Sequence, residues 1–208
     1  MIPQFLMCLT LVAVIYASEN SSCIIQNTFY YSNIFTTPTS NEEILFSEQF
    51  EYNHVDDDGI WSIIPVKNTS GEFFILNQKY LYIYASSDIV GNFITGKKRR
   101  VFAKTCKEEN CHKDEGFKWT FQEPEKIYGY TDFFETIKSF DIKYVVDQMR
   151  ILNVKYGEPL YAKPFAKNTY DLIWFINFFR LPKLYTAIEK LERSDSRGLE
   201  WVLYCNKI

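Results

Sequence analysis

Few side chains in this sequence have the types and spacing that nucleophilic catalysis requires. A serine or cysteine nucleophile needs a neighbouring base, and only two histidines, His54 and His112, occur. Both lie in polar stretches typical of solvated loops, and no Gly-x-Ser-x-Gly sequence is present. A glycine-rich phosphate-binding loop is also missing from a chain with eight glycines. The sequence therefore predicts a protein that is not an enzyme and has no cofactor.

Carboxylates gather at Asp56, Asp57 and Asp58, directly before Gly59. Paired carboxylates perform acid–base chemistry when the fold brings them together, which a sequence alone does not reveal. The cluster lacks the alternating ligands and the later glutamate of an EF-hand calcium loop. We interpret it as a solvated turn before the strand of Trp61, with ligand binding by a loop carboxylate as the alternative. The spacing of cysteines and histidines does not fit zinc, so no metal site is predicted.

The strongest concentration of positive charge is the basic run Lys97, Lys98, Arg99 and Arg100. It precedes an aromatic strand in a chain whose formal net charge is −3, a balance that argues against nucleic acid as a partner. A projecting loop with four cations suits a sulfated glycan or an acidic protein surface, so these residues are the predicted binding contacts. The alternative is a solvated hairpin loop whose charges protect a sheet edge.

The N-terminal residues predict secretion. The apolar run 5–17 is too short to span a bilayer comfortably and is followed by polar residues, as in a secretory signal. We expect a signal peptide over 1–18 and one extracellular domain over 19–208, with an uncleaved anchor as the alternative. No later stretch is apolar enough for stable membrane insertion. Two sequons, at Asn20 and Asn68, are candidate N-glycosylation sites.

Four cysteines remain after signal cleavage, and in an oxidising compartment an even number suggests two disulfides with three possible pairings. The interval from Cys106 to Cys111 is a short polar loop that a local bridge can close. Cys23 and Cys205 lie at opposite ends of the mature chain. We predict these two pairs, and the second requires that the two ends of the chain meet.

Three segments repeat one pattern, in which apolar strand-forming residues lead to an asparagine, an aromatic residue and a second apolar strand. The asparagines are Asn27, Asn77 and Asn153. Each segment is followed downstream by a tryptophan in a predicted strand of alternating pattern, namely Trp61, Trp119 and Trp201. Such units cannot bury their apolar faces alone and must pack against their copies. We therefore expect three four-stranded units, over about 23–66, 72–124 and 149–208.

Two stretches depart from the strand pattern. Leu184, Ile188 and Leu191 recur at helical spacing, so a short amphipathic helix is expected from about Pro182 to Arg193. The type of 131–148 stays open, because helical spacing there gives way to alternation. The expected fold is all-β with one or two short helical insertions.

Three such units behind a signal peptide resemble a β-trefoil. Residues 151–162 and 99–102 are similar to stretches in secreted trefoil-like proteins of insects, mosquitoes especially. The resemblance implies the architecture shared by ricin-type lectins and the C-terminal domain of insect 30-kDa haemolymph lipoproteins. Ricin-type units end in Gln-x-Trp near the sugar site, but here the first position is Gly59, Phe117 or Leu199. This departure puts the sugar site in doubt and favours core roles for the tryptophans.

The predicted function is that of a secreted, non-catalytic protein that recognises another protein or a glycan, polyanionic partners included, through loops on a rigid trefoil. An extracellular carrier or storage protein for an apolar or lipid ligand is the first alternative. A secreted inhibitor that presents one loop to a protease is the second.

Overall fold

The computed structural model describes residues 21–28, 32–36, 42–48, 57–77, 81–90, 97–124, 144–162, 184–188 and 196–207. Twelve strands run through them. The first six are β1 (Ser21–Asn27), β2 (Asn33–Thr36), β3 (Glu42–Glu48), β4 (Trp61–Pro65), β5 (Glu72–Asn77) and β6 (Leu81–Val90). The others are β7 (Lys98–Thr105), β8 (Trp119–Gln122), β9 (Tyr144–Asn153), β10 (Leu160–Ala162), β11 (Leu184–Ala187) and β12 (Trp201–Lys207).

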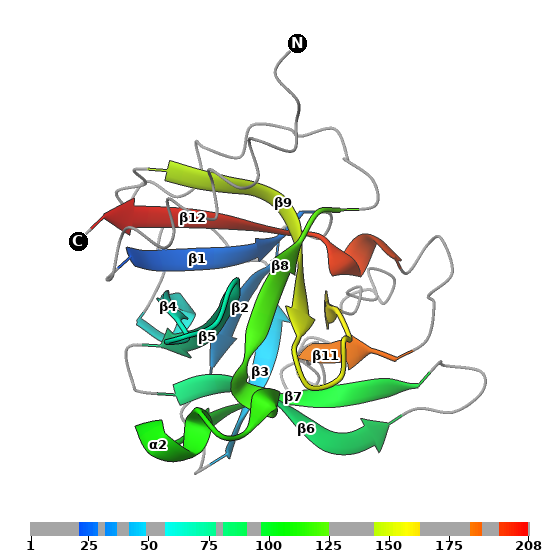
Figure 1. Ribbon diagram of the computed structural model, residues 1–208. Coiled ribbons are helices and arrows are strands. Elements are labelled where there is room, and N and C mark those ends of the chain that lie inside the picture. Colours follow the sequence, from blue (N-terminus) through cyan, green and yellow to red (C-terminus); the bar gives the residue numbers. More distant parts are fainter. Residues whose placement is uncertain are drawn as a thin grey trace.

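Six strands close into a barrel through antiparallel pairs. β1 pairs with β12 and β4, β5 pairs with β4 and β8, and β9 pairs with β8 and β12. The ring is complete because the first and last strands are neighbours, as Figure 1 shows for β1 in blue and β12 in red. A closed ring leaves no barrel strand with an unpaired edge.

The other six strands form three hairpins, β2–β3, β6–β7 and β10–β11. β7 joins the hairpins together because it also pairs with β3 and with β11. Each unit thus supplies two barrel strands and one hairpin. This three-unit arrangement is the β-trefoil, and the predicted fold class is confirmed.

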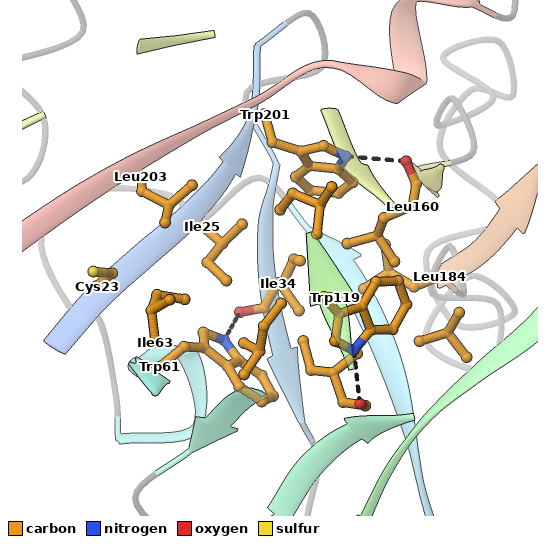
Figure 2. Close-up of a cluster of buried hydrophobic side chains, with 14 of the residues drawn as sticks. Cys23, Ile25, Ile34, Trp61, Ile63, Trp119, Leu160, Leu184, Trp201 and Leu203 are labelled. Atoms are coloured by element: carbon orange, nitrogen blue, oxygen red, sulfur yellow. Dashed lines mark hydrogen bonds between the residues drawn. The ribbon is translucent and has the colours of Figure 1, made fainter. Parts of the chain in front are cut away.

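The three tryptophans occupy equivalent positions in the core (Figure 2). Each is 0% exposed, and each indole Nε1 donates a hydrogen bond to a backbone carbonyl of the hairpin strand in its own unit. The acceptors of Trp61, Trp119 and Trp201 are Ile34, Ile83 and Leu160, at 2.9, 3.0 and 3.1 Å. The bond satisfies two polar groups that burial would otherwise leave costly. The prediction that the tryptophans are core residues is confirmed.

The repeated asparagines explain why the motif recurs. Each lies opposite the tryptophan of the preceding unit: Asn27 opposite Trp201, Asn77 opposite Trp61, and Asn153 opposite Trp119. Their buried amides bind backbone groups of neighbouring turns. The Nδ2 of Asn27, for example, donates to the Glu200 carbonyl at 3.0 Å. The Asn–Trp pairs therefore connect one unit to the next.

The expected helix from Pro182 to Arg193 is wrong at Leu184–Ala187, which form strand β11. Their backbone pairs with β10 on one side and with β7 on the other, and Leu184 is 1% exposed in the core. Tertiary pairing here overrides a local helical spacing. The remainder of the expected helix, except Ile188, lies outside the described residues.

The α-helix that the structure describes is α2 (Glu108–Cys111), which lies inside the short disulfide loop. Of the stretch left open, 144–148 begins strand β9, and 131–143 lies outside the described residues. The described residues contain no helix that is both long enough and apolar enough to cross a membrane. The predicted signal peptide over 1–18 and the Asn20 sequon lie outside the described part of the chain.

Both predicted disulfides are confirmed. Cys23 and Cys205 face each other directly in the β1–β12 register, with Cα atoms 4.1 Å apart. Cys106 and Cys111 enclose α2, with Cα atoms 5.8 Å apart. The first bridge lies in the barrel core and joins the two ends of the domain.

Candidate binding surface

Three residues of the basic run, Lys98, Arg99 and Arg100, lie in a strand, and Lys97 directly precedes it. Lys98–Thr105 is β7, which pairs with β6 along one edge and with β11 and β3 along the other. Lys98 and Arg99 are 9% and 8% exposed, whereas Lys97 and Arg100 are exposed. The Lys98 ammonium lies 4.6 Å from the centroid of the Tyr161 ring. The expectation that a loop presents four cations together is therefore wrong, and binding by this run stays a prediction.

Arg99 is held in a buried ion pair. Its Nε and Nη2 donate to the two carboxylate oxygens of Glu158, both at 2.9 Å, and its Nη1 donates to the backbone carbonyls of 86–87. The guanidinium carbon lies 3.5 Å from the centroid of the Tyr156 ring. The Thr186 hydroxyl also donates to Glu158. The hydrogen bonds to Glu158 raise the pKa of Arg99, and this cation stabilises the fold from within.

Beside this ion pair, four side chains from different elements meet at the surface: Tyr84 of β6, Asp114, and Lys155 and Tyr156 of the turn after β9. We call them the junction cluster, because they join the second unit to the third. Asp114 Oδ1 accepts hydrogen bonds from the Gly116 N–H at 2.9 Å and from Lys155 Nζ at 3.0 Å. The Asp114 and Lys155 side chains are 35% and 39% exposed.

Local sequence explains these positions. Asp114 is the N-cap of the 3-10 turn η2 (Glu115–Phe117), and an aspartate is favoured at such a cap because its carboxylate accepts a free backbone N–H. The β9–β10 turn closes through Gly157, whose φ of 65° is readily adopted by glycine. A hydrogen bond of 2.8 Å from the Gly157 N–H to the Asn153 carbonyl completes that turn. Lys155 and Tyr156 are therefore carried by a short, closed turn.

The charges of the junction cluster are set by its contacts. Partial burial raises the pKa of the Asp114 carboxyl, but the hydrogen bond from Gly116 and the ion pair with Lys155 lower it by more, so the pKa lies below its usual value. The hydrogen bond to Asp114 raises the pKa of Lys155. Burial, followed by the nearby negative charge of Asp114, raises the pKa of the Tyr84 phenol. At neutral pH the cluster thus combines the Asp114 carboxylate, the Lys155 ammonium and the neutral phenol of Tyr84.

The three units differ at the position of Tyr84. In each unit an aromatic residue follows the residue whose carbonyl accepts the tryptophan's hydrogen bond. In the first unit it is Phe35, which is 7% exposed, and in the third it is Tyr161, which is 1% exposed. Tyr84 is partly exposed. Its ring lies against the η2 turn so closely that a Cβ on Gly116 would be 2.6 Å from Tyr84 Cε2. The fold therefore fixes the ring and leaves part of it exposed to solvent.

The junction cluster was missed by sequence reasoning. The motif Ile-Leu-Asn-x-Lys-Tyr already contains Lys155 and Tyr156, and Asp114 precedes its tryptophan by five residues. Nothing in the sequence joins the two, because the Asp114–Lys155 pair spans 41 residues. In the sequence, Asp56 likewise precedes Trp61 by five residues, and Lys79 follows Asn77 as Lys155 follows Asn153. Both Asp56 and Lys79 lie outside the described residues.

The disulfide loop adjoins the junction cluster and is itself well packed. Cys111 lies in a small apolar cluster with Val66, Phe74 and Phe117, apart from the barrel core. The His112 ring contacts Phe74 edge-on, with ring centroids 5.0 Å apart. In the described part of the chain, no three His, Cys, Asp or Glu side chains gather to hold a metal ion.

The other predicted site residues lie apart from this surface. The three residues two before the tryptophans, Gly59, Phe117 and Leu199, are buried and do not present side chains to a ligand. Asp57–Gly59 form the 3-10 turn η1 before β4, as the turn interpretation of the acidic cluster expects, while Asp56 and His54 lie outside the described residues. Asn68 is exposed in the β4–β5 turn with a φ of 65°, and its glycosylation stays a prediction.

No protein-family model matches the chain, and no curated protein matches it in sequence. Solved structures do match its fold. The BEL β-trefoil is 10% identical with a TM-score of 0.53, covering 91% of this chain and 95% of its own. ThreeFoil, a designed threefold symmetric protein, is 8% identical with a TM-score of 0.54, covering 88% and 97%. A salivary protein of the Cysteine and Tryptophan-Rich family from Culex quiquefasciatus is 14% identical with a TM-score of 0.51, covering 90% and 96%. At these identities the likeness is one of fold, and the fold is that of the β-trefoil proteins.

Proposed function

We propose that this chain is a secreted, non-catalytic binding protein that recognises a protein or a glycan with the surface around the junction cluster. The junction cluster carries the proposal, because a partly exposed tyrosine there lies beside a carboxylate and an ammonium supplied by two different units. Two disulfides and the likeness in fold to a salivary protein support an extracellular location.

The chemistry of the junction cluster suits a polar ligand. Asp114 accepts hydrogen bonds and Lys155 donates them, and both side chains remain more than a third exposed. The Tyr84 ring, which packs against Phe117 and lies beneath the Lys104 ammonium, adds partly exposed aromatic surface next to them. Because the cap, the closed turn and the Gly116 contact already hold these groups in place, a ligand loses little affinity to ordering them.

The packing of the barrel favours this surface over the carrier alternative. Large side chains fill its described interior, among them the three tryptophans, Ile25, Ile63 and Leu203 (Figure 2). A small barrel filled in this way holds side chains in the place where a lipid would lie. Recognition at the surface is therefore the function that the described residues support best.

The test compares the native protein with Lys155→Ala and with Lys67→Ala, an exposed lysine in the β4–β5 turn that serves as the matched control. Binding is measured on a saccharide array and on fixed cells, before and after the cells are treated with protease or with endoglycosidase. We expect Lys155→Ala to weaken binding at least tenfold and Lys67→Ala to bind like the native protein. The cell treatment decides between a protein and a glycan. Equal binding by all three, or no binding by the native protein, contradicts the proposal.

A further inference from the structure

The two disulfides differ in how a reductant reaches them. Cys23 and Cys205 are 1% and 0% exposed and lie in the barrel core, where Figure 2 shows Cys23. Cys111 is also 1% exposed, but its partner Cys106 is partly exposed. Thiol–disulfide exchange requires that an attacking thiolate touch one sulfur. A reductant therefore reaches the Cys106–Cys111 bond more readily than the Cys23–Cys205 bond.

The two bonds also differ in what depends on them. Cys23 and Cys205 are 182 residues apart, so their bond joins the first and last barrel strands. Cys106 and Cys111 are 5 residues apart and enclose α2. The barrel ring does not pass through this short loop, since β7 ends at Thr105 and β8 begins at Trp119. Cleavage of the short bond therefore leaves the barrel pairs in place.

The short loop leads directly to the junction cluster. The backbone N–H groups of Lys113 and Asp114 both donate to the Asn110 carbonyl at 3.2 Å, one residue before Cys111. Asp114 then caps η2 and binds Lys155. The disulfide thus fixes the direction from which the chain reaches Asp114.

We propose that the Cys106–Cys111 bond is a redox switch that regulates the junction cluster. One thiolate of an external dithiol attacks the sulfur of Cys106, the bond between the two cysteines breaks, and Cys111 leaves as a thiolate that takes a proton from water. The second thiol of the reductant then displaces Cys106, which also becomes a thiol. Two electrons pass to the protein, and the dithiol becomes a disulfide.

Reduction releases α2 from its clamp, so that Asp114 is held beside Lys155 by its cap contacts alone. The oxidised protein is the binding form, and the reduced protein binds weakly. This consequence for a ligand rests on the proposed function, whereas the selective reduction and the loosening of the loop do not.

The first experiment treats the full mature protein with increasing dithiothreitol, traps free thiols with iodoacetamide and maps the modified peptides by mass spectrometry. We expect Cys106 and Cys111 to be modified at a reductant concentration at least tenfold below that needed for Cys23 and Cys205. Simultaneous modification of all four, or the reverse order, overturns the proposal.

The second experiment follows amide hydrogen exchange in the mildly reduced native protein and in the Cys106→Ser/Cys111→Ser variant. We expect faster exchange across 107–116 in both, with the barrel strands unchanged. Unchanged exchange across 107–116 overturns the switch whether or not a ligand is known. On the saccharide array, equal binding before and after reduction also overturns the redox switch. A native protein that binds nothing refutes the proposed function, and the hydrogen-exchange result then decides whether the disulfide holds the 107–116 segment in place.

Discussion

Replacing Arg99 with methionine should destabilise the protein far more than replacing Lys155 with methionine. Both residues form ion pairs, but the Arg99 and Glu158 side chains are 9% and 11% exposed, against 39% and 35% for Lys155 and Asp114. Methionine keeps a long apolar stem in each place, so the comparison isolates the charge and its hydrogen bonds.

The magnitude follows from the contacts that are lost. Arg99→Met removes both hydrogen bonds to Glu158 and both hydrogen bonds to the carbonyls of 86–87, and leaves a buried carboxylate without its cation. Breaking a buried ion pair costs about 3–5 kcal/mol, and we expect the lower end because both side chains keep some exposure. Lys155→Met should cost less than about 1 kcal/mol, as for other solvent-screened pairs.

Equilibrium unfolding in urea, followed by tryptophan fluorescence, measures both free energies. Adding Glu158→Gln alone and with Arg99→Met completes a double-mutant cycle, in which we expect the double variant to lose less stability than the two single losses added together. If Arg99→Met and Glu158→Gln each cost under about 1 kcal/mol and add without coupling, the ion pair is not a buried structural element. The basic run would then be solvated, and Arg99 would again be a candidate contact.

Three further stability or binding changes and one pH profile test other parts of the argument. Alanine at any of the core tryptophans should cost about 3–5 kcal/mol in thermal melts, and one variant that melts like the native protein would break the equivalence of Trp61, Trp119 and Trp201. Gly198→Ala should destabilise the protein more than Gly157→Ala, because a Cβ at Gly198 would lie 2.2 Å from a backbone carbonyl oxygen. A Cβ at Gly157 meets open space, so that change costs only about 1 kcal/mol for the positive φ. Equal losses of stability in urea would contradict the steric reason. On immobilised heparin, serine at Lys97 and Arg100 should lower the salt needed for elution, and co-elution with the native protein would show that the basic run is not a contact. Binding through the junction cluster should be constant from about pH 5 to about pH 9, because the pKa of its carboxyl is lowered from the ordinary 3.8 and the pKa of its ammonium is raised from the ordinary 10.5, so both stay charged throughout this window. A midpoint near pH 6–7 would implicate another group.

The repeat architecture and both disulfides could be predicted from the sequence. Alternating apolar residues and the asparagine and tryptophan positions are local patterns, and each is repeated three times, which makes an accidental match improbable. The pairing of Cys23 with Cys205 followed because three closed units bring the two ends of the chain together, as the β1–β12 register shows. These features depend on residue type and order along the chain.

The surface chemistry was decided by the tertiary structure. In the sequence, the run of four cations has the composition of a solvated loop. In the structure, β3, β6 and β11 pair with its strand, and Arg99 forms an ion pair with Glu158, 59 residues away. Leu184–Ala187 have helical spacing, yet β10 and β7 recruit their backbone into a strand. The junction cluster likewise joins residues far apart in the chain. Burial and pairing of this kind arise only when distant segments pack together, because the free energy of a charged side chain depends on what surrounds it in space.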